Sequence, residues 1–136
     1  MQNNRLKTST VKGTNYPEIY KKAFNFYKTI KAKSKRRPYV RSKYFENQKI
    51  FLELFWIHLH QKNKNERERR VSLFPVAVEF ISNSKSEPIL TAKGVKSSEI
   101  FYRFTAVTKD NQIFFIQIKE NKKSGQKWLM SIFPEK

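Results

Sequence analysis

The last third of the chain contains three runs in which apolar and polar residues alternate, and this pattern constrains the fold most. The runs are 100–107 (IFYRFTAV), 113–119 (IFFIQIK) and 127–133 (KWLMSIF), and Pro134 stops the last one. Aromatic and β-branched residues fill the runs, whereas Asp, Asn and Gly occur in the connections TKDNQ and ENKKSGQ. This composition is typical of β-hairpins. We therefore predict three consecutive antiparallel strands.

Alternation also assigns each residue to a face, because strand side chains point alternately to the two sides of a sheet. The expected core face consists of Tyr102, Phe104, Ala106, Phe114, Ile116, Ile118, Trp128, Met130 and Ile132. The expected outer face consists of Arg103, Thr105, Phe115, Gln117, Lys119, Leu129 and Ser131. Its polar side chains in mid-strand fit either a solvated surface or a binding site.

Charge is the second constraint. The 136 residues carry a formal net charge of +18 and include 12 Phe, 6 Tyr and 2 Trp. The aromatic content indicates a folded core in one domain, and the charge indicates a polyanionic partner, either nucleic acid or an anionic membrane. The chain has no cysteine and begins with a polar segment. We expect a cytoplasmic protein that does not span a membrane.

The first half of the chain is predicted to contain helices. We expect a flexible basic tail over 1–15 and one α+β domain over 16–136, with a first helix near Pro17 capped by Asn15. A second helix is predicted over 43–61, where an apolar stripe places His58 inward and His60 on another face. His58 is therefore either a core histidine or a proton-transferring group, and Trp56 is expected in the core.

The segments between these elements and the sheet are less regular. We expect a charged connector over 63–70, a short helix from about Ser72, with a strand over 76–81 as the alternative, and a flexible connection over 83–98. The predicted architecture is α+β, with N-terminal helices packed on a C-terminal antiparallel meander.

Basic residues cluster outside the strands. Seven of the thirteen residues in 31–43 (KAKSKRRPYVRSK) are Lys or Arg, which fits a solvated linker or a phosphate-binding segment. The residues that we expect to bind nucleic acid are Lys35, Arg36, Arg37, Arg41, Lys43, Arg69, Arg70, Lys122 and Lys123.

The sequence lacks the residues that several enzyme classes require. There is no glycine-rich phosphate loop and no HExxH motif, and only eleven acidic residues occur, of which Asp110 is the sole Asp. Two-metal nucleases need clustered carboxylates, so we expect no metal and no cofactor. RNA cleavage through the substrate's own 2′-hydroxyl needs neither, only proton transfer and charge stabilisation. The candidate catalytic residues are His58, Arg103, Gln117, Lys119 and Ser131.

The segment EIFYRFTAVTKDNQIFFIQIKENKKSGQKWLMSIFP resembles the three-stranded core of phage-type barnase–EndoU–colicin–RelE-like nucleases. The matching residues are Tyr102, Arg103, Phe104, Val107, Thr108, Asp110, Gln117, Ile118, Lys119, Lys122, Lys123, Gly125, Ser131 and Pro134. Upstream, His58 and the Arg69–Arg70 pair resemble the helical part, so the resemblance covers about 51–134. It implies a barnase/RelE-like fold and a metal-independent ribonuclease, often a toxin or a mobile-element component.

Two functions therefore remain open. One is a metal-independent, toxin-like endoribonuclease, which an acidic inhibitor protein would be expected to block by covering the sheet face. The alternative is a non-catalytic module that binds RNA or DNA through its basic surface. Peripheral membrane binding is a weaker third option, because the basic residues do not form one face of an amphipathic helix.

Overall fold

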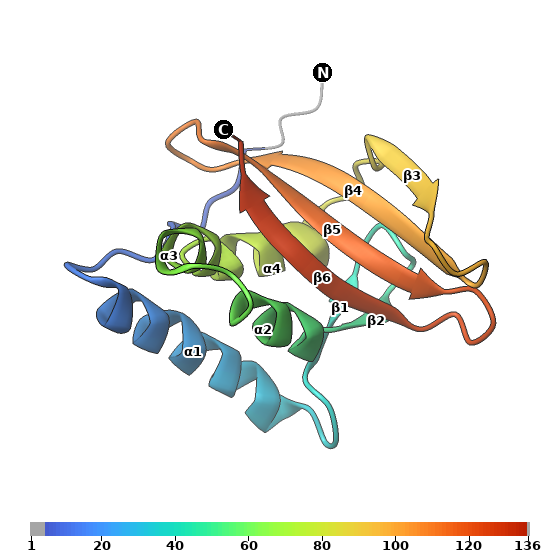
Figure 1. The fold of residues 1–136 in the computed structure, drawn as a ribbon, viewed down its shortest axis with the longest axis horizontal. Coiled ribbons are helices and arrows are strands. Elements are labelled where there is room, and N and C mark those ends of the chain that lie inside the picture. The colour runs from blue at the N-terminus through green and yellow to red at the C-terminus, as the bar shows by residue number, and fades with distance from the viewer. Residues whose placement is uncertain (1–4, 136) are drawn as a thin grey trace.

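The computed structural model describes residues 5–135 and combines four helices with one six-stranded sheet (Figure 1). The helices are α1 Tyr16–Lys33, α2 Glu53–Leu59, α3 Lys64–Val71 and α4 Phe74–Asn83. The strands are β1 Tyr39–Ser42, β2 Gln48–Phe51, β3 Leu90–Lys93, β4 Glu99–Val107, β5 Ile113–Asn121 and β6 Lys127–Pro134. Their order is β1-β2-β6-β5-β4-β3, antiparallel except for the β2–β6 pair. The predicted α+β class and the predicted meander are confirmed.

The β4–β5–β6 meander forms where alternation predicted it. Each residue of β4 from Glu99 to Val107 pairs with one of β5 from Asn121 to Ile113. Asn111 and Gly125 take positive φ values of 70° and 76° in the two turns, a conformation that Asn and Gly tolerate best among the amino acids. The turn chemistry and the strand pattern therefore agree.

A β-bulge in β6 corrects part of the face assignment. Gln117 pairs with Ser131, but the next residue, Ile118, pairs with Leu129, so Met130 is the extra residue. One inserted residue reverses the faces of everything before it on that strand. Leu129 is consequently fully buried and Trp128 is partly exposed. The prediction that Trp128 and Met130 belong to the core and Leu129 to the outer face was wrong.

Helix α4 is the centre of the core. Its side chains are almost all buried, and they pack in two directions. On one side Phe74 contacts the rings of Phe26 and Tyr27 in α1, and on the other Phe80 contacts Phe104 in β4. The expected helix after Ser72 is thus confirmed and the alternative strand is wrong. A helix that packs in two directions needs apolar residues on more than one face, so its sequence can resemble that of a buried strand.

The predicted helix over 43–61 was wrong in its first half. Residues 39–51 form the β1–β2 hairpin, and only Glu53–Leu59 are helical. The reversal between the strands uses Glu46 and Asn47 at φ 56° and 66°, and two left-handed residues cannot continue a helix. The apolar residues from Phe51 onward belong partly to the end of β2 and partly to the short helix α2. Periodicity alone could therefore not locate the boundary between the strand and the helix.

Two further segments are more regular than predicted. The charged connector over 63–70 contains α3, whose N-terminus is capped by Asn63 as its side chain accepts a 2.9 Å hydrogen bond from the N–H of Glu66. The expected flexible connection over 83–98 contains edge strand β3, which pairs with β4. Among residues 5–135, no helix combines the length and the apolar character needed to cross a bilayer.

The N-terminal segment makes contacts that the prediction of a flexible tail did not include. Leu6 is buried and its N–H donates to the carbonyl of Val107 at 2.9 Å. The backbone N–H groups of Lys7 and Thr8 donate to the carboxylate of Glu79 at 2.7–3.1 Å. Residues 1–4 of that predicted tail lie outside the described residues. The contacts of 5–8 fasten this segment beside the end of β4 and along α4.

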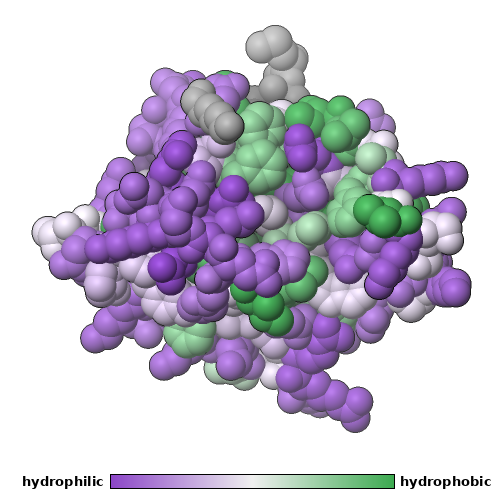
Figure 2. All heavy atoms as spheres, in the orientation of Figure 1, coloured by the Kyte–Doolittle hydropathy of each residue, from purple (hydrophilic) through white to green (hydrophobic). Residues whose placement is uncertain are grey.

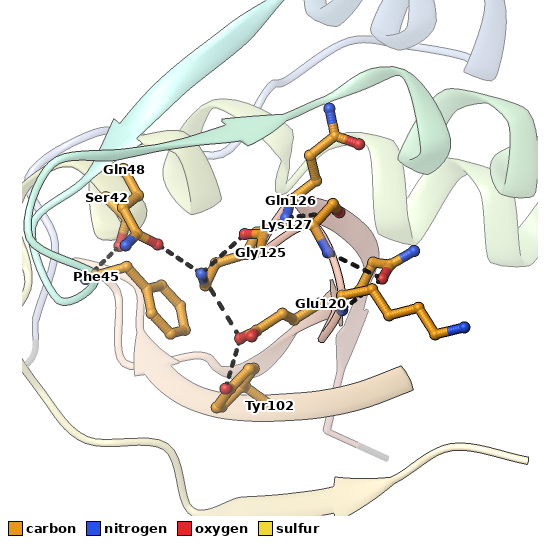
Figure 3. Close-up of polar contacts among 11 residues, drawn as sticks. Ser42, Phe45, Gln48, Tyr102, Glu120, Gly125, Gln126 and Lys127 are labelled. Atoms are coloured by element: carbon orange, nitrogen blue, oxygen red, sulfur yellow. Dashed lines mark hydrogen bonds and ion pairs between the residues drawn. The ribbon is translucent and has the colours of Figure 1, made fainter. Parts of the chain in front are cut away.

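A buried lysine connects the parallel β2–β6 pair to the rest of the sheet (Figure 3). Lys127 is 5% exposed, and its ammonium donates to Gln48 Oε1 at 2.5 Å and to the carbonyl of Gly125 at 3.2 Å. The Glu120 carboxylate lies 3.6 Å away and also accepts a 2.7 Å hydrogen bond from Tyr102. Burial, followed by the contact with Glu120, raises the pKa of Tyr102 to about 12. The cluster compensates a buried charge at the point where the two halves of the sheet join.

Candidate functional site

A cleft opens where the helices meet one edge of β6. Strand β2 pairs only with Lys127 and Trp128 of this edge, and α2 and α3 lie along the remainder (Figure 1). The cleft, here called the central cleft, has a volume of about 420 Å³. Its lining consists of His58, Gln61, Lys62, Arg70, Arg103, Gln117, Met130, Ser131 and Phe133. Three of these are cationic and none is acidic.

The sheet supplies the floor of the central cleft. Arg103 of β4 and Gln117 of β5 are directly opposite each other, and Gln117 is opposite Ser131 of β6. The guanidinium of Arg103 donates two hydrogen bonds to the Gln117 amide oxygen, from Nη2 at 3.0 Å and Nε at 3.3 Å. The Gln117 amide nitrogen then faces the sulfur of Met130 at 3.7 Å. These contacts hold both polar groups in defined positions on the outer face.

Helix α3 supplies the second guanidinium. Arg70 Nη1 donates a 3.0 Å hydrogen bond to the Ser131 hydroxyl, and Arg70 Nε contacts Glu66 at 3.3 Å. Its guanidinium lies 5.7 Å from the centre of the Phe133 ring, and that of Arg103 lies 5.1 Å from the same ring. Two cations from distant parts of the chain therefore flank one aromatic side chain.

Helix α2 supplies the imidazole. Phe55 and Leu59 are buried and anchor the helix. His58, one turn after Phe55, reaches the rim of the central cleft and is only partly buried. His60 lies on the side of α1, with its Nε2 3.4 Å from the hydroxyl of Tyr20. His58 is thus a cleft residue rather than a core residue, and His60 faces another direction, as the helical spacing predicted.

Lys119 is the one candidate catalytic residue that does not line the central cleft. Its ammonium pairs with Glu99 at 2.9 Å and lies 5.9 Å from the Trp128 ring centre. The Lys119 ammonium holds the pKa of the Glu99 carboxyl below its usual range. Lys119 therefore belongs to the same sheet face but to the neighbouring row of side chains.

The expected nucleic-acid-binding residues divide among several places. Arg70 belongs to the central cleft, and Arg69 of the same helix points elsewhere, into a separate depression beside Gly13. Lys35, Arg36 and Arg37 line a second groove, described below. The remaining members, Arg41, Lys43, Lys122 and Lys123, are exposed in the β1–β2 and β5–β6 hairpins.

The second groove, here called the hairpin groove, has a volume of about 520 Å³ and lies at the β1–β2 edge of the sheet. It is lined by Lys33, Lys35, Arg36, Arg37, Tyr39, Lys49, Phe51 and Gln126. Arg37 donates to both oxygens of Glu53 at 2.9 and 2.7 Å, and its guanidinium lies 4.1 Å from the Phe51 ring centre. Hydrogen bonding to Glu53 raises the pKa of Arg37.

Sequence reasoning missed several lining residues. Gln61 and Lys62 follow α2 and give no local signal for a cleft. Phe133 and Met130 enter the lining through the strand end and the bulge. Lys49 and Phe51 were missed because 43–61 was predicted as a helix, and Tyr39 was missed because 31–43 was predicted as a basic linker or phosphate-binding segment. A test of strand alternation over 39–42 and 48–51 is the signal that could have found them.

The central cleft combines groups suited to one kind of ligand. Guanidinium groups bind phosphate oxygens in a fork geometry, and imidazole is the side chain that exchanges a proton near neutral pH. The amide of Gln117 and the hydroxyl of Ser131 add hydrogen-bonding groups beside them. Residues 5–135 contain no group of three or more His, Cys, Asp or Glu side chains placed to hold a metal ion.

Comparisons of this chain with protein-family models, with curated proteins and with solved structures find no significant match. We therefore infer the function from the chemistry of the central cleft and of the surface around it. The resemblance to barnase–EndoU–colicin–RelE-like nucleases remains a prediction from the sequence.

Proposed function

We propose that the protein is an endoribonuclease that cleaves RNA through the substrate's own 2′-hydroxyl. One observation carries the proposal: an imidazole, two guanidinium groups, an amide and a hydroxyl from five different elements converge on one cleft. These groups belong to His58, Arg70, Arg103, Gln117 and Ser131. Convergence of an acid–base group with phosphate-binding groups is the minimum that such a reaction requires.

In the proposed reaction the scissile phosphate lies between the two arginines. His58 accepts the proton of the 2′-hydroxyl as the 2′-oxygen forms its bond to phosphorus. The bond from phosphorus to the 5′-oxygen then breaks, and this oxygen takes a proton from water, to which the cleft is open. Arg70 and Arg103 balance the extra negative charge of the phosphorane, and the products are a 2′,3′-cyclic phosphate and a 5′-hydroxyl.

The test is incubation of the purified protein with an unstructured RNA in the presence of EDTA, beside His58→Ala and His60→Ala. Cleavage is expected from the protein and from His60→Ala, with fragments that end in 2′,3′-cyclic phosphate. His58→Ala should lose about 10²-fold to 10⁴-fold in rate. A substrate with 2′-deoxyribose at the cleavage position should stay intact, since the nucleophile is absent.

A non-catalytic RNA-binding module is the second candidate, favoured by the hairpin groove, whose cations lie apart from the central cleft. Intact RNA together with salt-sensitive binding, unaffected by His58→Ala, would support this candidate instead. For either function a cationic cleft without carboxylates is complementary to an acidic protein, so an acidic inhibitor of the same face is part of the proposal.

A further inference from the structure

A row of side chains crosses the outer face of the sheet next to the central cleft. Tyr39 of β1 pairs with Phe51 of β2, Phe51 is level with Trp128 of β6, Trp128 pairs with Lys119 of β5, and Lys119 pairs with Phe101 of β4. Paired residues lie on one face, about 4.8 Å from strand to strand. Four of these five positions are aromatic and all are partly exposed. We call this set the aromatic row.

The position of Trp128 in this row depends on the bulge at Met130. Without the extra residue Trp128 would point into the core, where Leu129 now is fully buried. The bulge thus replaces an aliphatic residue by an indole ring on the outer face. Indole is the widest ring among the side chains, and exposing it costs hydrophobic stabilisation. A ligand that covers the ring would recover that loss.

Cations accompany the aromatic row along its length. Lys119 lies 5.9 Å from the centre of the Trp128 ring, and Lys49 lies 4.7 Å from that of Tyr39. At the β1–β2 end the hairpin groove adds Lys33, Lys35 and Arg36. In the part of the chain that the structure describes, these three and Lys49 are exposed and have no carboxylate within 4.0 Å. Their charge is therefore available to a ligand.

The planar guanidinium group of Arg37 is held in a fixed position. The two hydrogen bonds from Arg37 to Glu53 and the 4.1 Å distance to the Phe51 ring fix the Arg37 guanidinium, while 40% of its side chain stays exposed. Guanidinium planes, like aromatic rings, stack on nucleic-acid bases. Arg37 and Phe51 together extend the stacking surface into the hairpin groove.

The aromatic row and the central cleft are adjacent. Lys119 and Gln117 are alternate residues of β5 on the same face, as are Phe101 and Arg103 of β4. A strand of nucleic acid that leaves the cleft at Gln117 meets the row at once. Figure 2 shows separate apolar patches among hydrophilic side chains on the face turned toward the viewer.

We propose that the aromatic row and the hairpin groove form a binding track for unpaired nucleotides next to the central cleft. Bases stack on Trp128, Phe51 and Tyr39, and the hairpin-groove cations contact the phosphates. This chemistry requires a single strand, because the bases of a duplex are stacked on one another and their faces are inaccessible. This proposal rests on the proposed function in one respect: it assumes that the strand bound by the track is the strand that is cleaved in the central cleft.

The test measures binding separately from cleavage. Fluorescence anisotropy with a 12-nucleotide unstructured DNA, which cannot be cleaved through a 2′-hydroxyl, gives Kd for the protein and for Trp128→Leu, which keeps apolar bulk but loses the flat ring. Phe115→Leu is the matched control, since Phe115 lies on the same face beyond the central cleft. Trp128→Leu should raise Kd about tenfold or more, and Phe115→Leu should change it little.

Length and strandedness give the second readout. Trp128→Leu and a Lys35→Glu/Arg36→Glu variant should raise KM for a 12-nucleotide RNA by a much larger factor than they raise KM for a dinucleotide, which is too short to extend along the track. A duplex of the same sequence should bind more weakly than the single strand at 150 mM salt. Equal binding of duplex and single strand, or a Trp128→Leu variant with unchanged Kd, overturns the track.

The two proposals fail in different ways. Binding that depends on Trp128 without any cleavage supports the track and contradicts the ribonuclease. The opposite result is cleavage that depends on His58 together with a Kd that does not change in Trp128→Leu or in Lys35→Glu/Arg36→Glu. That result supports the ribonuclease and contradicts the track. Circular dichroism and a urea midpoint of each variant identify any that does not fold, and Tyr39→Ser then repeats the test from the edge strand.

Discussion

The guanidinium of Arg70 and the hydroxyl of Ser131 form a 3.0 Å hydrogen bond across 61 residues of sequence. This contact joins α3 to β6 and brings a helical cation to the polar row of the sheet. It also separates Arg70 from its neighbour Arg69, which points to a different depression. Two adjacent arginines of identical chemistry therefore have different surroundings and make a matched pair.

Arg70→Ala should lower the rate of RNA cleavage about 10²-fold to 10³-fold, because one of two groups that stabilise the developing charge is lost. Arg69→Ala should lower the cleavage rate less than about threefold at the same salt concentration, because Arg69 contributes at most a single phosphate contact. Single-turnover rates with one RNA measure both. Equal losses in the two variants would mean that only net charge matters, as in a binding module.

Lys119→Met and Arg103→Met should separate binding from chemistry. Lys119 lies in the aromatic row, so its loss should raise KM several-fold and leave kcat unchanged. Arg103 lines the central cleft, so its loss should lower kcat about 10²-fold or more. Steady-state kinetics on a 12-nucleotide RNA distinguish these outcomes. A large kcat effect in Lys119→Met would place Lys119 in the reaction and contradict its assignment to the row.

Lys127→Met should lower the free energy of unfolding by about 2–4 kcal/mol, because it leaves the largely buried Glu120 carboxylate without its cation. The double variant Lys127→Met/Glu120→Leu should recover part of this loss, since a buried ion pair replaced as a whole by apolar groups is often nearly neutral. Urea denaturation of both variants and of Glu120→Leu completes the cycle. Additive losses would show that the two groups are not coupled.

Glu79→Gln should loosen the N-terminal segment and make stability less dependent on pH. Burial raises the pKa of the Glu79 carboxyl, but hydrogen bonds from Lys7 and Thr8 outweigh it and the net pKa lies below 4.5. Folding thus favours the ionised form. The stabilisation is fully present above pH 4.5 and is lost as the pH falls through the lowered pKa.

The expected loss in Glu79→Gln is about 1–2 kcal/mol at pH 7. The difference from the parent protein should shrink steadily on acidification below pH 4.5. Urea midpoints from pH 7 to pH 3 measure it, with the exposed Glu87→Gln as control. A difference that is the same at every pH would assign the effect to packing rather than to ionisation.

Much of the architecture could be predicted from local patterns. Alternation located β4, β5 and β6, the Asn15 cap and Pro17 located the start of α1, and the helical spacing located α4. These signals are local because hairpins, caps and helix faces depend on residues within a few positions. The β1–β2 hairpin was missed because its second strand leads into α2 without a break in the apolar pattern.

The candidate site divides in the same way. Alternation alone put Arg103, Gln117 and Ser131 on one face, and helical spacing separated His58 from His60. Only the tertiary structure decided that Arg70 joins the central cleft, that Lys119 does not, and that Trp128 faces outward. The physical reason is that contacts between distant segments determine both the one-residue bulge at Met130 and the packing of α3 beside β6. The local alternation of apolar and polar residues carries no information about such contacts.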